Sequence, residues 1–142
     1  EELEEKKKEI DIEIKKKQPG ENEMSSQIIQ AAHDIGCALH HLGLSMGKSG
    51  WYQKERDVYS EALRLKLLSG CSDTSIAETT LSMSICYRNL GDLWAALTRC
   101  KDALSAETKV HGENHISISK IFHRQGILLS ELEEYDDALI CF

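Results

Sequence analysis

Proline is almost absent from this chain, and its rarity is informative about the fold. Pro19 is the single proline among 142 residues, and β-branched residues seldom follow one another. Proline interrupts helices and central strands, whereas runs of β-branched residues are typical of strands. The sequence therefore predicts an all-α fold.

Long apolar runs and an excess of positive charge are also missing. No apolar run approaches the roughly 18–20 residues that a membrane-spanning helix needs, and the charged N-terminal segment does not resemble a secretory signal peptide. The formal net charge of −7 argues against broad binding to nucleic acid. We therefore expect neither a membrane nor a nucleic acid as the partner.

The cysteines form no CxxC pair, and their number is odd. Several fall on the expected apolar faces of helices, where a free cysteine behaves as a small hydrophobic residue. This pattern favours a reducing, cytoplasmic setting, with a disulfide framework or a zinc site as the alternative. The five residues are Cys37, Cys71, Cys86, Cys100 and Cys141.

The sequence has no Gly-rich phosphate loop, no HExxH motif and no nucleophile elbow. We therefore expect no enzymatic activity, no cofactor and no bound metal. His33, Cys37 and His41 are spaced to share one helix face, a spacing that can hold zinc, but we interpret them as a partly exposed helix surface. His111 and His115 flank a Gly-Glu-Asn turn, and we interpret them as residues that shape this loop.

A helical hairpin recurs along the chain at a spacing of 41–42 residues. Residues 87–104 read as the end of one helix, a tight turn at Gly91, and a second helix with an apolar residue every three or four positions. Gly50 precedes Gly91 by 41 residues, and Ala96 precedes Ala138 by 42. A hairpin repeated at a fixed period is the signature of a solenoid.

The apolar spacing predicts six helices. We expect the first to be capped by Ser25 or Ser26, and a closely crossing helix to explain Gly43 in its middle. The chain stops within the sixth helix and leaves an apolar face uncovered at Phe142, which predicts a fragment of a longer protein. The expected helices cover about 25–48, 52–68, 75–90, 93–110, 116–132 and the residues from 135 onward.

The first 18 residues are dominated by charge and are expected to form a solvated helix. Leu3, Ile10 and Ile14 would supply a thin coiled-coil seam, and disorder is the alternative. The following Pro-Gly pair favours an interruption. We therefore divide the chain into an N-terminal helix or linker, residues 1–23, and a repeat domain, residues 24–142.

Residues 24–142 resemble tetratricopeptide repeats. The signature of that family is W-x2-L-G-x2-Y, followed by A-x3-F and a further alanine. The departures are Glu55 where alanine is usual, Ser84 where glycine is usual, and Glu133 at the third turn. The positions that correspond to the signature are Leu39, Leu42, Gly43, Met46, Tyr59 and Ala62 in the first repeat, Thr80, Met83, Ser84, Tyr87, Ala96, Cys100 and Ala103 in the second, and Phe122, Gln125, Gly126, Leu129, Ala138 and Phe142 in the third.

The usual tetratricopeptide repeat has about 34 residues, so the period of this chain is long. The longer form resembles the repeats of kinesin light chains, on the segments SIAETTLSMSICYRNLGD and HGENHISISKIFHRQG. The resemblance implies an α-α superhelix of antiparallel helical hairpins. It also implies that the first helix of each repeat lines a concave groove.

By the family's register, the groove positions carry four basic side chains against two acidic ones, although the whole chain is acidic. Such a groove would suit an acidic peptide or helix. The predicted partner-binding residues are His40, His41, Leu44, Lys48, Ile85, Arg88, Asn89, Lys120, His123, Arg124 and Ile127.

The sequence thus predicts a non-catalytic scaffold that binds a protein or peptide partner in its concave groove. Two alternatives stay open at this point. In the first, the chain is a structural subunit of a larger assembly or homo-oligomer, joined through its N-terminal segment or open C-terminal end. In the second, it is the targeting module of a longer multidomain protein.

Overall fold

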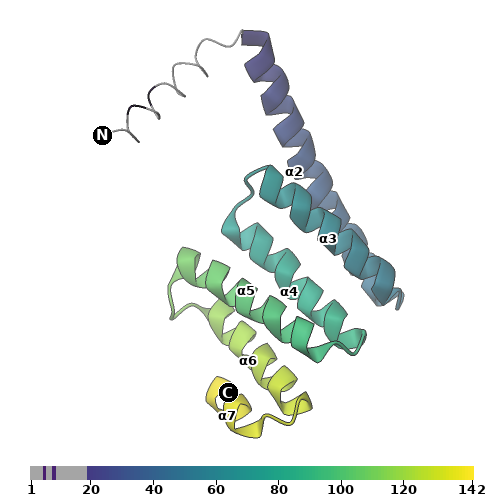
Figure 1. Ribbon diagram of the computed structural model, residues 1–142, viewed down its shortest axis with the longest axis vertical. Helices are drawn as coiled ribbons and strands as arrows, with labels where there is room; N and C mark the ends of the chain where they lie inside the picture. The colour runs from purple at the N-terminus through teal and green to yellow at the C-terminus, as the bar shows by residue number, and fades with distance from the viewer. Residues whose placement is uncertain (1–4, 6–7, 9–18) are drawn as a thin grey trace. The chain divides into compact units, whose positions relative to one another are not determined.

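The computed structural model describes Glu5, Lys8 and residues 19–142. Apart from those first two residues, the predicted helix, coiled coil or disorder of residues 1–18 lies outside the described part of the chain. The all-α prediction is confirmed for the described residues (Figure 1). The helices are α2 (Pro19–Lys48), α3 (Tyr52–Leu68), α4 (Asp73–Asn89), α5 (Leu93–His111), α6 (Ile116–Glu131) and α7 (Tyr135–Cys141).

The first helix begins earlier than the sequence predicted. The expected N-caps, Ser25 and Ser26, lie inside α2, which starts at Pro19. A proline is tolerated in the first turn of a helix because the N–H group at that position has no partner within the helix. The prediction of a cap at the serines was therefore wrong.

The chain forms two compact units, residues 1–31 and residues 32–142. The described part of the first unit includes the beginning of α2, where residues 23–31 are exposed to solvent. The second unit contains the rest of α2 and all later helices. The domain boundary predicted after residue 23 stays a prediction.

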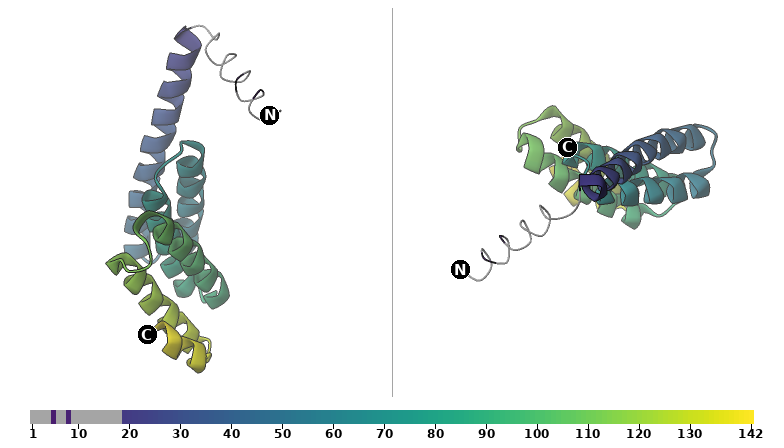
Figure 2. Two further views of the ribbon diagram at one scale, coloured as in Figure 1. Left: turned by 90° about the vertical axis from the view of Figure 1, so that its left-hand side faces the viewer. Right: turned by 90° about the horizontal axis from the view of Figure 1, so that it is seen from above.

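Within the second unit, the helices pack in sequential order. The neighbouring pairs are α3 with α4, α4 with α5, α5 with α6, and α6 with α7, which run side by side in Figures 1 and 2. Tight turns between consecutive helices produce this arrangement of stacked hairpins. Among the described residues, no helix combines the length and the apolar character that crossing a membrane would require.

Three equivalent turns end the first helix of each hairpin. Gly50 and Gly91 have φ values of 78° and 83°, and Glu133 takes the same left-handed conformation at 64°. At the second turn, Gly91 N–H donates to Arg88 O, and the next N–H donates to Tyr87 O at 2.9 Å. This is the Schellman arrangement, which satisfies carbonyl groups at the end of a helix. The turns are 41 and 42 residues apart, so the predicted period is present in the structure.

Small side chains allow the helices to approach closely in the core. Ala62, Ala96 and Ala103 are fully buried, and Tyr59 fills the space between α3 and α4. A Cβ atom placed on Gly43 would lie 2.4 Å from Cε1 of Tyr59. The prediction that a closely packed neighbour explains Gly43 is therefore confirmed.

Candidate functional site

A concave space of about 260 Å³ lies between α4 and α6. Both helices pack against α5, and their side chains at three- and four-residue spacing face this space. We call it the α4–α6 groove. Its lining residues are Ser84, Ile85 and Arg88 from α4, and Lys120, His123, Arg124, Ile127 and Leu128 from α6.

An ion pair joins the two helices at this groove. The Nε atom of Arg88 donates to both carboxylate oxygens of Glu131, at 2.8 and 3.0 Å, and Nη2 of the same guanidinium also donates to Oε1. These hydrogen bonds hold the pKa of Glu131 below its usual value and raise that of Arg88. The positive charge of Arg88 is thus largely compensated within the chain.

Lys120 and Arg124 carry the remaining full positive charges of the groove. Among the described residues, neither of them forms an ion pair. The Nε atom of Arg124 is buried and has no hydrogen-bond partner within that part of the chain. An unpaired buried donor costs on the order of 1–3 kcal/mol, so this guanidinium is a candidate for recognition of an acceptor.

The inner wall of the groove is polar at Ser84, whose Oγ lies 2.9 Å from Sγ of Cys100. Burial raises the pKa of the Cys100 thiol, and the hydrogen bond with Ser84 and the charge of Arg124 oppose that shift. A thiol with a raised pKa stays protonated and is a poor nucleophile. This cysteine therefore belongs to the core.

The structure brings six of the predicted groove residues together and leaves five outside the α4–α6 groove. His41, Leu44 and Lys48 are exposed on α2, and Asn89 is exposed at the last position of α4. The fifth, His40, is described below. The six that line the groove are Ile85, Arg88, Lys120, His123, Arg124 and Ile127.

His40 is buried, with 9% of its surface exposed, and is not available to a partner. Its Nδ1 atom lies 3.1 Å from Oγ1 of Thr79, which also receives a hydrogen bond from Nζ of Lys66 at 2.9 Å. Since an ammonium group only donates, Thr79 accepts from Lys66, and its one hydroxyl proton can go either to His40 or to the carbonyl of Ser75. Burial, followed by the charge of Lys66, lowers the pKa of His40 to about 4. We therefore remove His40 from the candidate binding surface.

Sequence reasoning missed two contributors to the groove wall, Ser84 and Leu128. Ser84 stands where the repeat motif has glycine, and this departure from the motif could have indicated a role for its side chain. A hydroxyl here can point across to α5 and bond to Cys100. Leu128 lies one turn beyond Arg124 on the same helix face, and the sequence alone identifies it only as a core residue.

The predicted cluster on α2 forms only in part. Nε2 of His33 lies 3.9 Å from Sγ of Cys37, as their spacing indicated. Nδ1 of the same ring lies 2.8 Å from Sγ of Cys71, which belongs to the loop after α3. His41 instead has its ring 5.6 Å from that of His40. The two thiols contact opposite ring nitrogens of one histidine, so the three groups do not converge on a common point.

Residues 75–142 match the family model described as Tetratricopeptide repeat. This segment belongs to the tetratricopeptide repeat family. The family expectation drawn from the sequence is therefore confirmed, and so is the architecture of sequential helical hairpins. Tetratricopeptide repeats are generally protein-interaction modules and are typically non-catalytic.

Two solved structures resemble this chain in fold. BtubC (BKLC) from P. vanneervenii is 17% identical with a TM-score of 0.71, over 75% of this chain and 42% of that one. The TPR domain of Arabidopsis FLU is 12% identical with a TM-score of 0.70, over 78% of this chain and 90% of that one. This chain thus spans less than half the length of BtubC. A comparison with curated proteins found no match.

Proposed function

We propose that the α4–α6 groove binds a protein segment that carries acidic side chains. The observation that carries the proposal is the convergence of six groove residues, named from the repeat register alone, around one concave space. If the charged side chains were only solvated on helix surfaces, they would not need to gather around one space. The partner class follows from the chemistry of those residues.

The charges of the groove favour an acidic side chain. Lys120 and Arg124 lie one helical turn apart on α6, and neither forms an ion pair within the described residues. A guanidinium can hold a carboxylate through two parallel hydrogen bonds, and a lysine adds a mobile point charge. Together they provide a site for the carboxylate of a glutamate or aspartate.

The apolar residues of the groove fit the rest of the partner segment. Ile85 is 38% exposed although it is aliphatic, and Ile127 lines the same space from α6. A space of about 260 Å³ suits one or two side chains rather than a whole peptide. We therefore expect a segment that runs along the groove and inserts an acidic side chain next to an aliphatic one.

A labelled peptide tests this function. The probe alternates glutamate and leucine, and its matched control replaces every glutamate by glutamine. We expect fluorescence anisotropy to show binding of the glutamate peptide only, with an affinity that falls as the salt concentration rises. Equal binding of the two peptides would contradict the acidic partner class.

A charge-reversal pair tests the position of the site. The double variant Lys120→Glu with Arg124→Glu should abolish binding of the glutamate peptide. The matched double variant Lys101→Glu with Lys109→Glu changes the net charge equally, but both lysines lie exposed on α5 outside the groove. It should retain most of the affinity. If the two double variants lose affinity to the same extent, the groove is not the site.

A structural role through self-association is the second candidate. Leu139, Ile140 and Phe142 are exposed large apolar side chains on and just after α7, and exposed apolar patches commonly mark interfaces. Light scattering over a concentration series distinguishes the two roles. A stable oligomer that takes up no glutamate peptide favours the structural role.

A further inference from the structure

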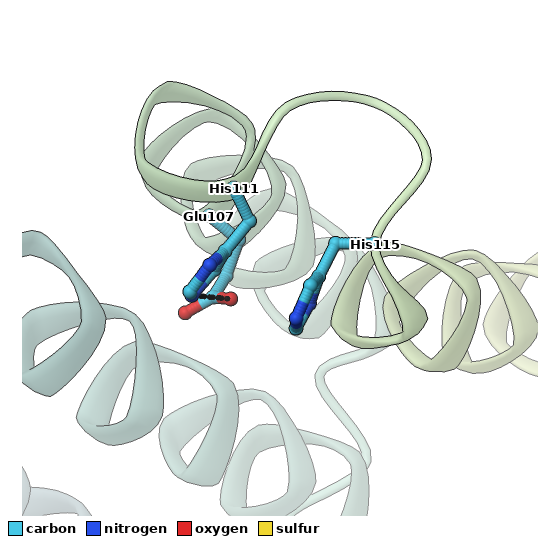
Figure 3. Close-up of side chains that lie close together, drawn as sticks. All are labelled: Glu107, His111 and His115. Atoms are coloured by element: carbon cyan, nitrogen blue, oxygen red, sulfur yellow. Dashed lines mark ion pairs between the residues drawn. The ribbon is translucent and has the colours of Figure 1, made fainter.

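Glu107, His111 and His115 bring three potential metal ligands together where α5 ends and α6 begins. One ligand atom from each residue lies within 4.8 Å of the others (Figure 3). Oε2 of Glu107 is 3.6 Å from Nε2 of His111. The rings of the two histidines are 4.1 Å apart and nearly parallel, with 15° between their planes.

The local sequence explains this arrangement. Glu107 and His111 are four residues apart near the end of α5 and therefore share one face of that helix. Gly112 then takes a φ of 76°, which ends the helix and reverses the chain. His115 is the N-cap residue of α6, so the short loop returns its ring to the same place.

The surroundings of the cluster have a mixed charge. Glu107 is only 6% exposed, and a buried carboxylate is costly unless a cation compensates it. Glu78 and Lys120 line the adjoining space of about 270 Å³ and contribute opposite charges. The carboxylate of Glu107 and the two imidazoles are thus the groups that converge in this space.

We propose that Glu107, His111 and His115 form a binding site for Zn²⁺. Two imidazole nitrogens and one carboxylate oxygen are ligands that Zn²⁺ accepts, with bonds of about 2.0–2.1 Å and a further position for water. Tetrahedral bonds of that length set the ligand atoms about 3.4 Å apart. The pair formed by Glu107 and His111 already has a separation of 3.6 Å.

Binding requires a small rearrangement of the histidines. The lone pair of an imidazole nitrogen lies in the ring plane, so two parallel rings cannot both point at one ion. His111 is the last residue of α5 and its side chain is 31% exposed, so its ring can turn once it leaves the stacked contact with His115. The ligand atom of His115 lies within 4.8 Å of the other two, so its distance to each of them has to shorten by at most about 1.4 Å to reach the tetrahedral separation.

Ser117 places an acceptor beside Nδ1 for the tautomer of His115 that binds the ion. Nδ1 of His115 lies 2.8 Å from Oγ of Ser117, and it also lies 3.2 Å from the backbone N–H of Ser117. Without metal, Nδ1 accepts this N–H and caps α6, so the proton is on Nε2. With zinc on Nε2, the proton moves to Nδ1 and is donated to the hydroxyl, as metal-bound histidines commonly donate to a neighbouring acceptor. Ser117 is thus a positioning residue.

Isothermal titration of the metal-free chain with zinc chloride tests the site. We expect one ion per chain, and at least a tenfold loss of affinity in each of the variants Glu107→Gln, His111→Gln and His115→Asn. Asparagine retains the capacity to cap α6, so His115→Asn separates loss of a ligand from loss of the fold. His41→Gln, an exposed histidine on α2, is the matched control and should bind as the wild type does.

Three outcomes would overturn the proposal. The first is a wild-type chain that takes up no zinc, and the second is ligand variants that bind it unchanged. The third is loss of binding in Cys71→Ser, because that result would place the ion beside His33 and the thiols. We expect Cys71→Ser to bind normally and the cobalt-loaded chain to lack a thiolate charge-transfer band.

Nuclear magnetic resonance of the imidazole nitrogens tests the role of Ser117. In the wild type, zinc should move the proton of His115 from Nε2 to Nδ1. In Ser117→Ala the affinity should fall by about 10–100-fold, the range for groups that orient a ligand. An unchanged tautomer on addition of zinc, or an unchanged affinity in Ser117→Ala, would contradict this part of the proposal.

Discussion

Arg88 and Glu131 form an ion pair across the groove from residues 43 positions apart in the sequence. They occupy the first helices of successive repeats, and Arg88 is one of the partner-binding residues predicted from the sequence. Their side chains are 45% and 34% exposed, and ion pairs at such a surface contribute little to stability. Glu131 therefore matters chiefly because it competes with the carboxylate of a partner for the guanidinium of Arg88.

Glu131→Gln tests that competition. The free energy of unfolding in urea should fall by less than about 1 kcal/mol, while the affinity for the glutamate peptide should rise because Arg88 is released. The pKa of Glu131 is lowered in the folded state, so its stabilising effect is present above its unfolded value of 4.5 and is lost on acidification below it. A drop in peptide affinity would mean that Glu131 itself supports the partner.

Gly43 and Gly126 occupy corresponding positions in two repeats but face different neighbours. A Cβ on Gly43 would strike the buried ring of Tyr59 at 2.4 Å. A Cβ on Gly126 would meet the exposed side chain of Phe142 at 2.7 Å, which can swing away. We expect Gly43→Ala to cost about 1–3 kcal/mol and Gly126→Ala to be neutral or stabilising, since alanine favours helices by about 1 kcal/mol.

Thermal unfolding of the two alanine variants measures this difference. Both substitutions are chemically identical and lie within helices, so each serves as the control for the other. Equal effects would show that the close approach of Tyr59 to α2 is not maintained in solution.

The repeated turns show what sequence reasoning can find. Gly50 and Gly91 are recognisable because glycine is the residue that adopts positive φ without strain, and apolar periodicity located the helices between them. The third turn was placed from the repeat period, but Glu133 gives no signal of its own that it takes the left-handed conformation.

The groove shows where such reasoning fails. The family register gave six residues that converge, because helical spacing fixes which positions share a face. It also gave His40, which instead bonds to Thr79, 39 residues away. That contact depends on how two helices pack, and a pattern within one helix does not contain this information.

The cluster at the end of α5 was only partly recognised. His111 and His115 were noted in the sequence, and Glu107 could have been added as a third potential ligand because it lies four residues before His111.

Glu133→Gly should stabilise the chain. A non-glycine residue in the left-handed region costs about 1–2 kcal/mol, and glycine already occupies the equivalent positions, Gly50 and Gly91. Glycine also loses more entropy on folding, so we expect a net gain of about 0.5–1 kcal/mol in urea unfolding. The reciprocal variant Gly91→Ala should lose at least as much. A destabilised Glu133→Gly would mean that the side chain of Glu133 makes a favourable contact.

His40 makes stability depend on pH. Its folded pKa of about 4 lies below the usual 6.5, so the unfolded chain binds the additional proton between these values. Stability is therefore complete above about pH 6.5 and falls as the pH drops to 4, by at most about 3 kcal/mol. His40→Gln should remove this slope, whereas His41→Gln, with an exposed ring, should retain it. Urea unfolding across this pH range provides the measurement.

Glu55 should produce a slope of the opposite sign. This residue stands where the repeat motif usually has alanine, and it is 5% exposed with one carboxylate oxygen, Oε2, unpartnered. Burial raises its pKa above 4.5, and hydrogen bonds with Cys86 and Tyr59 oppose that shift. The folded chain thus retains a proton that the unfolded chain has released, so the free energy of unfolding falls as the pH rises above 4.5.

Glu55→Gln removes this penalty without changing the size of the side chain. At pH 7 the variant should be more stable than the wild type by about 1–3 kcal/mol, the cost of an unsatisfied buried polar group, and the difference should vanish below pH 4.5. Glu61→Gln, on the exposed face of α3, is the control and should be slightly destabilising because its carboxylate bonds to Arg64. If Glu55→Gln destabilises the chain at pH 7, the charged carboxylate has a favourable partner, and its presence in place of alanine is then explained by that contact.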